Sequence, residues 1–115
     1  MPRHQPEGYV YAIRTEDSTR VKIGFTCTAT PSNRLAALQR ATKQRLVLVH
    51  AIRVPTPFAV EGLLHDLLAP FRLDGEWFTL DKQILTIFPD LVFYVRHMVR
   101  LAGHVASDEE GVNVW

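Results

Sequence analysis

Four residues near the N-terminus could form a polar site if the segments that carry them pair as a β-hairpin. The strand-like segments "GYVYAIR" and "RVKIGFT" flank the polar stretch "TEDST", a pattern that predicts two antiparallel strands. With the turn centred directly after Glu16, Tyr11 lies opposite Lys22 and Tyr9 lies opposite Gly24, all on one face. A nearby ammonium favours ionisation of a phenol, and a glycine leaves room for a ligand. The alternative is a lysine that only packs its stem on a tyrosine ring.

A carboxylate and an imidazole follow one helical turn apart in "EGLLH", as Glu61 and His65. The surrounding segment is apolar, so a metal ion or an arginine is needed to offset the cost of burying Glu61. A salt bridge to Arg34, or an exposed helix edge, is the alternative. Arg34 lies near the start of a predicted helix, where its guanidinium and free backbone N–H groups could bind a phosphate. Solvation at the surface is the alternative for Arg34.

The elements that position these residues follow the order β–β–α–β–α–(β)–α. A helix capped by Ser32 or Asn33 follows the hairpin, and the loose alternation of "RLVLVHAIRV" predicts a third, central strand. An amphipathic helix is predicted in "PTPFAVEGLLHDLLAPF", and "DGEWFTL" is a turn with a short extended piece. Helical segments follow from Asp81 to Gly103. The fold class predicted is α+β, with a small three-stranded antiparallel sheet flanked by helices.

The length of 115 residues suits one domain with modest extensions. We expect an N-terminal arm, a core domain, a C-terminal helical extension that packs on the domain or forms a dimer interface, and an acidic tail. Their ranges are 1–7, 8–80, 81–103 and 104–115. A single cysteine excludes an intrachain disulfide and fits a reducing compartment. The first residues lack the apolar core of a secretory signal, and no apolar run is long enough to span a bilayer. The expectation is an intracellular, cytoplasmic protein without a membrane partner.

The net charge of +1 hides an uneven distribution along the chain. Residues 1–53 carry nine Lys or Arg and three Asp or Glu, whereas residues 54–115 carry four and nine. The basic half favours a polyanion such as nucleic acid as the partner. The alternative is that the two halves neutralise each other within one fold.

The order and spacing of these motifs resemble the GIY-YIG nuclease domain. The pattern "GYVYAI…VKIGFT…RLAAL…AVEGLLHDLLA…GEWF" is most similar to the small, phage-type branch of that superfamily. In this branch lysine commonly replaces the tyrosine of the second motif, and an "E-[WF]-F" segment closes the domain. The resemblance covers roughly residues 8–80. It implies a metal-dependent endonuclease that hydrolyses DNA, with a phage or mobile element among the settings it allows.

The resemblance also implies roles for individual residues. Tyr11 would act as general base or position the attacking water, and Lys22 would lower the pKa of Tyr11 or contact the scissile phosphate. Gly24 would permit close approach of the backbone, and Arg34 would stabilise the developing charge. Glu61 would hold a single Mg²⁺, or Mn²⁺ in its place, that stabilises the leaving oxygen.

The remaining candidates complete the predicted site. Tyr9 and His65 are further catalytic candidates, and His65 could either transfer a proton or support Glu61. The candidates for nucleic-acid binding are Gly24, Arg40, Lys43, Arg45 and Trp77. Trp77 and Phe78 could stack on a base, although aromatic residues that close a core are the favoured interpretation.

Two departures from the wider superfamily keep a second function open. Leu38 stands where many members carry a histidine, and no asparagine occurs between Asn33 and Asn113. The alternative is therefore a weakly active or inactive module of the same fold that binds nucleic acid or a protein. DNA is the expected partner, RNA is not excluded, and a homodimer would place two sites on two strands.

Overall fold

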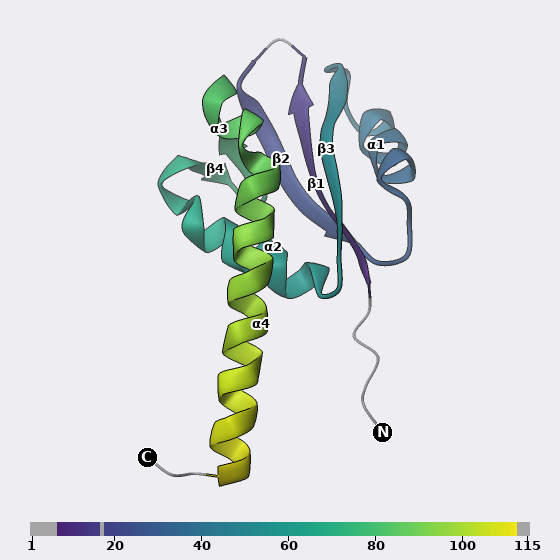
Figure 1. Ribbon diagram of the computed structural model, residues 1–115. Helices are drawn as coiled ribbons and strands as arrows, with labels where there is room; N and C mark the ends of the chain where they lie inside the picture. The colour runs from purple at the N-terminus through teal and green to yellow at the C-terminus, as the bar shows by residue number, and fades with distance from the viewer. Residues whose placement is uncertain (1–6, 17, 113–115) are drawn as a thin grey trace.

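A five-stranded antiparallel sheet is the centre of the computed structural model, which describes residues 7–16 and 18–112, and side chains as far as residue 103 (Figure 1). The strands are β1 (Gly8–Thr15), β2 (Arg20–Thr26), β3 (Leu46–Val54), β4 (Arg72–Asp74) and β5 (Trp77–Thr79), in the spatial order β3-β1-β2-β5-β4. The prediction of three strands is therefore wrong, although the α+β class holds. The two missed strands have three residues each, too few for a period-two pattern to identify them.

Four α-helices and one short 3₁₀ turn connect and cover the strands in the described residues. They are α1 (Pro31–Arg40), α2 (Pro57–Leu67), the turn η1 (Ala69–Phe71), α3 (Lys82–Thr86) and α4 (Phe88–Val112). The first helix begins one residue after Thr30, whose side chain accepts a hydrogen bond from Asn33 N at 3.1 Å. The predicted caps Ser32 and Asn33 are therefore wrong, because Pro31 already occupies the first helical position. Among the described residues, no helix has both the length and the apolar character that crossing a membrane requires.

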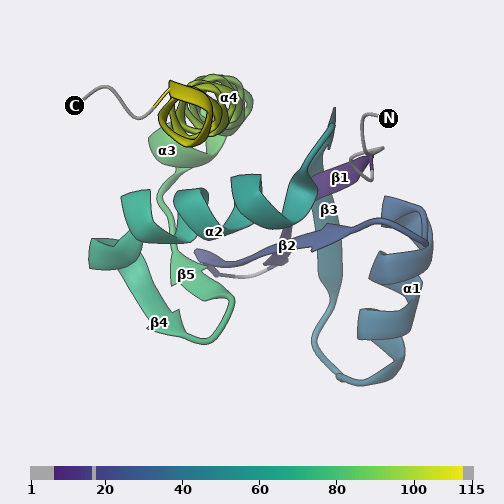
Figure 2. The ribbon, with the colours of Figure 1, turned by 90° about the horizontal axis from the view of Figure 1, so that it is seen from below.

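Helices cover the two faces of the sheet unequally. The helices α2 and α4 lie on one face, and α1 lies on the other, beside β3 and β1 (Figure 2). The larger core fills the first face with buried strand and helix residues: Val10, Ala12, Val21, Ile23, Val54, Phe78, Val60, Leu64, Phe88, Val92 and Val95. The smaller core on the α1 face comprises Tyr11, Ile13 and Leu46, with half-buried Leu35, Leu38, Leu48 and Trp77 packed against it. The period of two along β1 and β2 thus divides the hairpin between two environments.

The third strand is an edge strand, and the predicted central position of "RLVLVHAIRV" is wrong. Only one side of β3 pairs within the sheet, with β1. Most of its residues are half-buried or exposed, and only the terminal Leu46 and Val54 are buried. Its loose alternation therefore reflects incomplete cover rather than cover on both faces.

The hairpin pairs two residues out of the predicted register. Tyr11 lies opposite Gly24, and Tyr9 lies opposite Thr26, whereas Lys22 lies opposite Ile13. A register shift of two keeps every side chain on its predicted face, because the side-chain period is also two. The shared face was thus predicted correctly, but the neighbours across the strands were not. Lys22 becomes a diagonal neighbour of Tyr11.

Candidate functional site

The Tyr11 ring lies directly over Gly24, its partner on β2. A Cβ atom added to Gly24 would be 2.5 Å from Tyr11 Oη and 2.6 Å from Cζ, far inside van der Waals contact. Tyr11 is only 1% exposed, and it packs in the cluster with Ile13 and Leu46. Gly24 therefore provides the space in which the phenol crosses the strand, and the glycine that interrupts "VKIGFT" has a steric explanation.

Lys22 forms an ion pair with Glu76, the residue just before β5. The Lys22 Nζ and Glu76 Oε1 atoms are 3.1 Å apart, and the two side chains are 15% and 39% exposed. The Lys22 ammonium also lies 5.6 Å from the centroid of the Trp77 ring, on which Arg20 Cζ lies at 5.2 Å. Lys22 is thus held where β2 pairs with β5 rather than directly across from Tyr11.

Glu61 is a buried carboxylate with an unsatisfied oxygen. The residue is 7% exposed, and its Oε2 atom has no hydrogen-bond partner in the part of the chain that the structure describes. Burial, then the charge of Glu76 and a hydrogen bond with the Glu76 carboxyl, raise the pKa of Glu61 from 4.5 to about 7. The Lys22 charge opposes this rise. Glu61, Glu76 and Lys22 therefore form one electrostatic cluster.

His65 attaches α2 to β2, and its hydrogen bond in the described part of the chain goes to the backbone rather than to the cluster. Its Nε2 lies 3.0 Å from the carbonyl oxygen of Ile23, and a carbonyl can only accept, so Nε2 carries the hydrogen. The His65 ring packs edge-on against Phe78, with centroids 4.9 Å apart. The predicted spacing of Glu61 and His65 thus places one residue at the cluster and the other at a structural contact one turn later.

Arg34 and Glu61 do not pair. No ion pair between them occurs among residues 7–16 and 18–103, so the proposed salt bridge is wrong as an explanation for the buried carboxylate. Arg34 lies in the first turn of α1, where its Nε atom is buried without a hydrogen-bond partner. Leu35 and Leu38 of the same helix pack against the Tyr11 cluster. Arg34 therefore belongs to the Tyr11 face, and Glu61 reaches the site from α2.

The candidates for nucleic-acid binding lie in two places. Arg40 ends α1, and Lys43 and Arg45 follow in the exposed connection to β3. Arg45 pairs with Glu16 at 3.2 Å between two largely exposed side chains, near the tip of the hairpin. Trp77 is half-buried on the Tyr11 face, whereas Phe78 is fully buried in the larger core, as the favoured interpretation expected.

Sequence reasoning missed Glu76 as a member of the site. It stood inside the quoted "GEWF" segment, but only its aromatic neighbours received a role. The turn before it contains Gly75 at φ 55°, and the Glu76 carbonyl accepts a hydrogen bond from Ile23 N at 2.9 Å. A charged residue directly after a turn glycine, next to a short aromatic strand, was the available signal.

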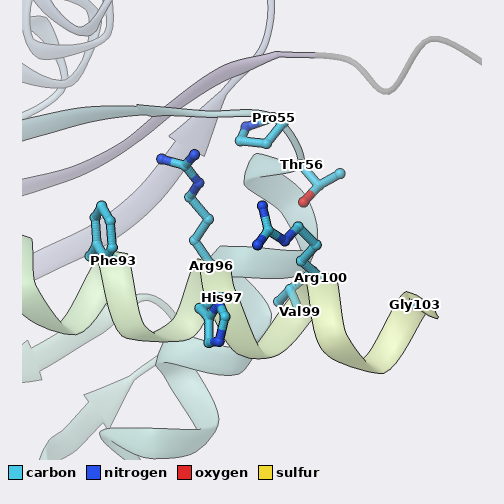
Figure 3. Close-up of a pocket in the computed structure, with 8 residues that line it drawn as sticks. All are labelled: Pro55, Thr56, Phe93, Arg96, His97, Val99, Arg100 and Gly103. Atoms are coloured by element: carbon cyan, nitrogen blue, oxygen red, sulfur yellow. The ribbon is translucent and has the colours of Figure 1, made fainter. Parts of the chain in front are cut away.

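Three pockets of the described region lie away from this cluster. A pocket of about 460 Å³ lies between the start of α2 and α4, where Arg96 and Arg100 extend toward Pro55 and Thr56 (Figure 3). Two further hollows also follow α4. None of the residues predicted from the sequence lines any of these three pockets.

The Glu61 cluster fits a hard divalent cation in its donor type. Carboxylate oxygens are the ligands that Mg²⁺ and Mn²⁺ favour, and Glu61 presents a buried oxygen without a partner. The described residues contain no group of three or more His, Cys, Asp or Glu side chains suited to a metal. Any ion held here would therefore depend on few protein ligands and on water or phosphate.

Comparison with known families connects this arrangement to a phage-associated domain. Residues 8–93 match the model of the T5orf172 domain, which is found in nuclease-like proteins, and this family is consistent with a nuclease-like or DNA-binding role. Comparisons with curated proteins and with solved structures give no match. The matched segment contains the whole hairpin, α1, α2 and both carboxylates of the cluster, Glu61 and Glu76. The chain belongs to the T5orf172 domain family.

Proposed function

We propose that this protein is a divalent-cation-dependent DNA endonuclease with a GIY-YIG-type mechanism. The observation that carries the proposal is the buried carboxylate of Glu61, with its unpartnered oxygen, beside the Lys22–Glu76 ion pair. A structural domain gains nothing from such a group, because an unpaired buried charge costs stability. Perturbed ionisable groups of this kind cluster at functional sites.

The residues would divide the work of phosphodiester hydrolysis. In its ionised form, Tyr11 would accept a proton from the attacking water, whose oxygen bonds to phosphorus while the P–O bond to the leaving oxygen breaks and that oxygen takes up a proton from solvent. Arg34, with its unpaired buried Nε, is placed on the Tyr11 face to bind the phosphate oxygens. Glu61 would hold Mg²⁺ or Mn²⁺, which supplies stabilisation of negative charge on the leaving oxygen when bound. Gly24 keeps the Tyr11 phenol in place.

The surface around the site would bind the DNA backbone. Arg20 and Lys22 lie over Trp77 on the same face, and Arg40, Lys43 and Arg45 add positive charge near the hairpin tip. Phosphate contacts of this kind bind without reading sequence and weaken as salt rises. A second copy of the chain could place a second site on the other strand, and α4 exposes Phe93 and Tyr94, which a dimer would cover.

The test is a cleavage assay on supercoiled plasmid with Mg²⁺ or Mn²⁺. Glu61→Gln and Tyr11→Phe should each reduce the rate at least a hundredfold, whereas Asp66→Asn, an exposed substitution on the same helix as Glu61, should leave it unchanged. Cutting that continues unimpaired in Glu61→Gln would overturn the proposed role of this carboxylate.

The second candidate function is a nucleic-acid-binding module with little turnover. The observation that favours it is the burial of Tyr11, because a general base at 1% exposure has little access to water. Salt-dependent binding of oligonucleotides, without cleavage under Mg²⁺ or Mn²⁺, would establish this function instead.

A further inference from the structure

Two carboxylates and one ammonium meet where β2 pairs with β5, and their charges do not balance when both carboxylates are ionised. Lys22 is paired with Glu76 at 3.1 Å, and Glu61 lies next to Glu76. One ammonium can neutralise one carboxylate, and Glu76 already has it. The Glu61 Oε2 atom, on a residue that is 7% exposed, has no partner in the described part of the chain. One positive charge with a preference for oxygen ligands is missing.

The backbone holds both carboxylates around the same residue. Ile23 donates its N–H to the carbonyl of Glu76 at 2.9 Å, and its own carbonyl accepts from His65, one turn after Glu61 on α2. The segment that carries Glu76 and the helix that carries Glu61 are thus both attached to the backbone of Ile23, one through its N–H and the other through its C=O. This fixed geometry is what a binding site needs if its ligands are to be in place before the ligand arrives.

The two carboxylates differ in their access to solvent. Glu61 is almost fully buried, whereas the Glu76 side chain is 39% exposed. An ion can therefore arrive from water at Glu76 and be held against Glu61. Mg²⁺ is usually bound by one or two carboxylates, and it keeps several waters or takes phosphate oxygens at its remaining positions.

We propose that Glu61 and Glu76 together form the divalent-cation site, and that Lys22 is the counter-ion of Glu76 until the cation binds. The inference rests on the proposed function and extends it, because it adds Glu76 as a second ligand. Once the cation neutralises Glu76, the Lys22 ammonium is free to bind a phosphate oxygen of the DNA. Ion binding and substrate binding are then linked through a single lysine.

The proposal is tested by titrating the full chain with Mn²⁺ at pH 8 without DNA, following free Mn²⁺ by electron paramagnetic resonance. Glu61→Gln should abolish binding, and Glu76→Gln should weaken it at least tenfold. Glu76→Asp should recover part of the affinity, because it restores a carboxylate. Lys22→Met should tighten binding severalfold, because it removes a competing positive charge. Asp66→Asn is the matched control, and urea unfolding of each variant confirms that it is folded.

The outcomes distinguish this inference from the proposed function. Unchanged Mn²⁺ affinity in Glu76→Gln, or no Mn²⁺ binding by the unmodified chain, overturns the two-carboxylate site. A second overturning result is Mn²⁺ binding that Lys22→Met weakens, because Lys22 would then support the ion rather than compete with it. Binding that depends on both carboxylates in a chain that does not cut DNA would support the site while rejecting the nuclease. DNA cutting that depends on an ion bound without Glu76 would support the nuclease and reject the two-carboxylate site.

Discussion

The packed apolar clusters of the sheet and the polar cluster formed by Lys22, Glu61 and Glu76 follow opposite physical rules. On the face toward α2 and α4, Val10, Val21 and Ile23 are fully buried among other apolar side chains. In the polar cluster, Lys22 and Glu76 form an ion pair, and Glu61, which reaches the cluster from α2, is buried without a full set of partners. One region lowers the free energy of the fold, and the other raises it.

The difference indicates which residues stabilise the fold and which are kept at a cost in stability for their chemical role. Apolar burial contributes roughly 25 cal/mol for each Å² removed from water, so the larger core can support a neighbouring group that is unfavourable. Natural proteins commonly keep such destabilising groups where function requires them. Substitutions in the two regions should therefore change stability with opposite signs.

The largest effect is expected from Glu61→Gln, because it removes the buried charge. The pKa of Glu61 is about 7 in the folded chain against an ordinary 4.5, so the folded state holds a proton that the unfolded state releases. Stability from this group is complete below pH 4.5 and is lost as pH rises through about 7, by about 3 kcal/mol. Urea unfolding with a chelator at pH 4 to 8 should show this loss in the unmodified chain and a flatter profile in Glu61→Gln.

The control is Asp66→Asn, an exposed change on the same helix, which should follow the unmodified profile. At pH 8 Glu61→Gln should be the more stable protein. If Glu61→Gln is less stable than the unmodified chain at pH 8, the Glu61 charge does not destabilise the fold.

A smaller effect of opposite sign, about 2 kcal/mol of destabilisation, is expected from Gly24→Ala. The new methyl group would overlap Tyr11 Oη and Cζ, and the ring cannot move aside because Leu35 and Leu38 pack against its cluster. Tyr11→Phe should not rescue the variant, since Cζ remains 2.6 Å from the added carbon. Chemical denaturation measures the change.

Gly62→Ala provides the contrast for this variant. A Cβ at Gly62 meets nothing within 4 Å, and alanine in the interior of α2 should stabilise by about 0.5 to 1 kcal/mol. Equal unfolding midpoints for the two alanine variants would remove the steric explanation for Gly24.

The smallest effect, about 1 kcal/mol, is expected from His65→Phe, at the boundary between the two regions. The substitution keeps an aromatic ring next to Phe78 but deletes the hydrogen bond to the Ile23 carbonyl. Thermal unfolding should show a lower midpoint than His97→Phe, a change at an exposed position of α4. If the two variants melt together, the hydrogen bond does not join α2 to the sheet.

Much of the fold could be predicted because its longer elements carry strong periodic patterns. The hairpin, the two helices that flank β3, and the helical C-terminal region all follow from strand alternation or helical spacing. The strands β4 and β5 have three residues each, and the pairing of β5 with β2 depends on Phe78 entering the core beside Val21. That contact is long-range, so no local pattern reports it.

The sequence predicted which hairpin residues share the face of the site, but not which residues they contact. The shared face of Tyr11, Lys22 and Gly24 depends only on alternation, which a shift of two preserves. The direct neighbours depend on the position of the turn, whose centre lies one position further along the chain than the predicted centre directly after Glu16. The partner of Lys22 is Glu76, which lies 54 positions away in the sequence, and only the five-stranded sheet places the two together.

Hydrogen exchange at the backbone of Ile23 can report whether the cluster of Lys22, Glu61 and Glu76 is intact. The Ile23 N–H and C=O are bound to the turn before β5 and to α2, respectively. Exchange of that amide hydrogen with solvent requires the Glu76 segment to detach, and detachment separates the acidic pair. The exchange rate of this amide therefore measures how often Glu61 and Glu76 separate. Slower exchange on adding a cation would show that the cation holds the two carboxylates together, even in a protein without measurable cleavage.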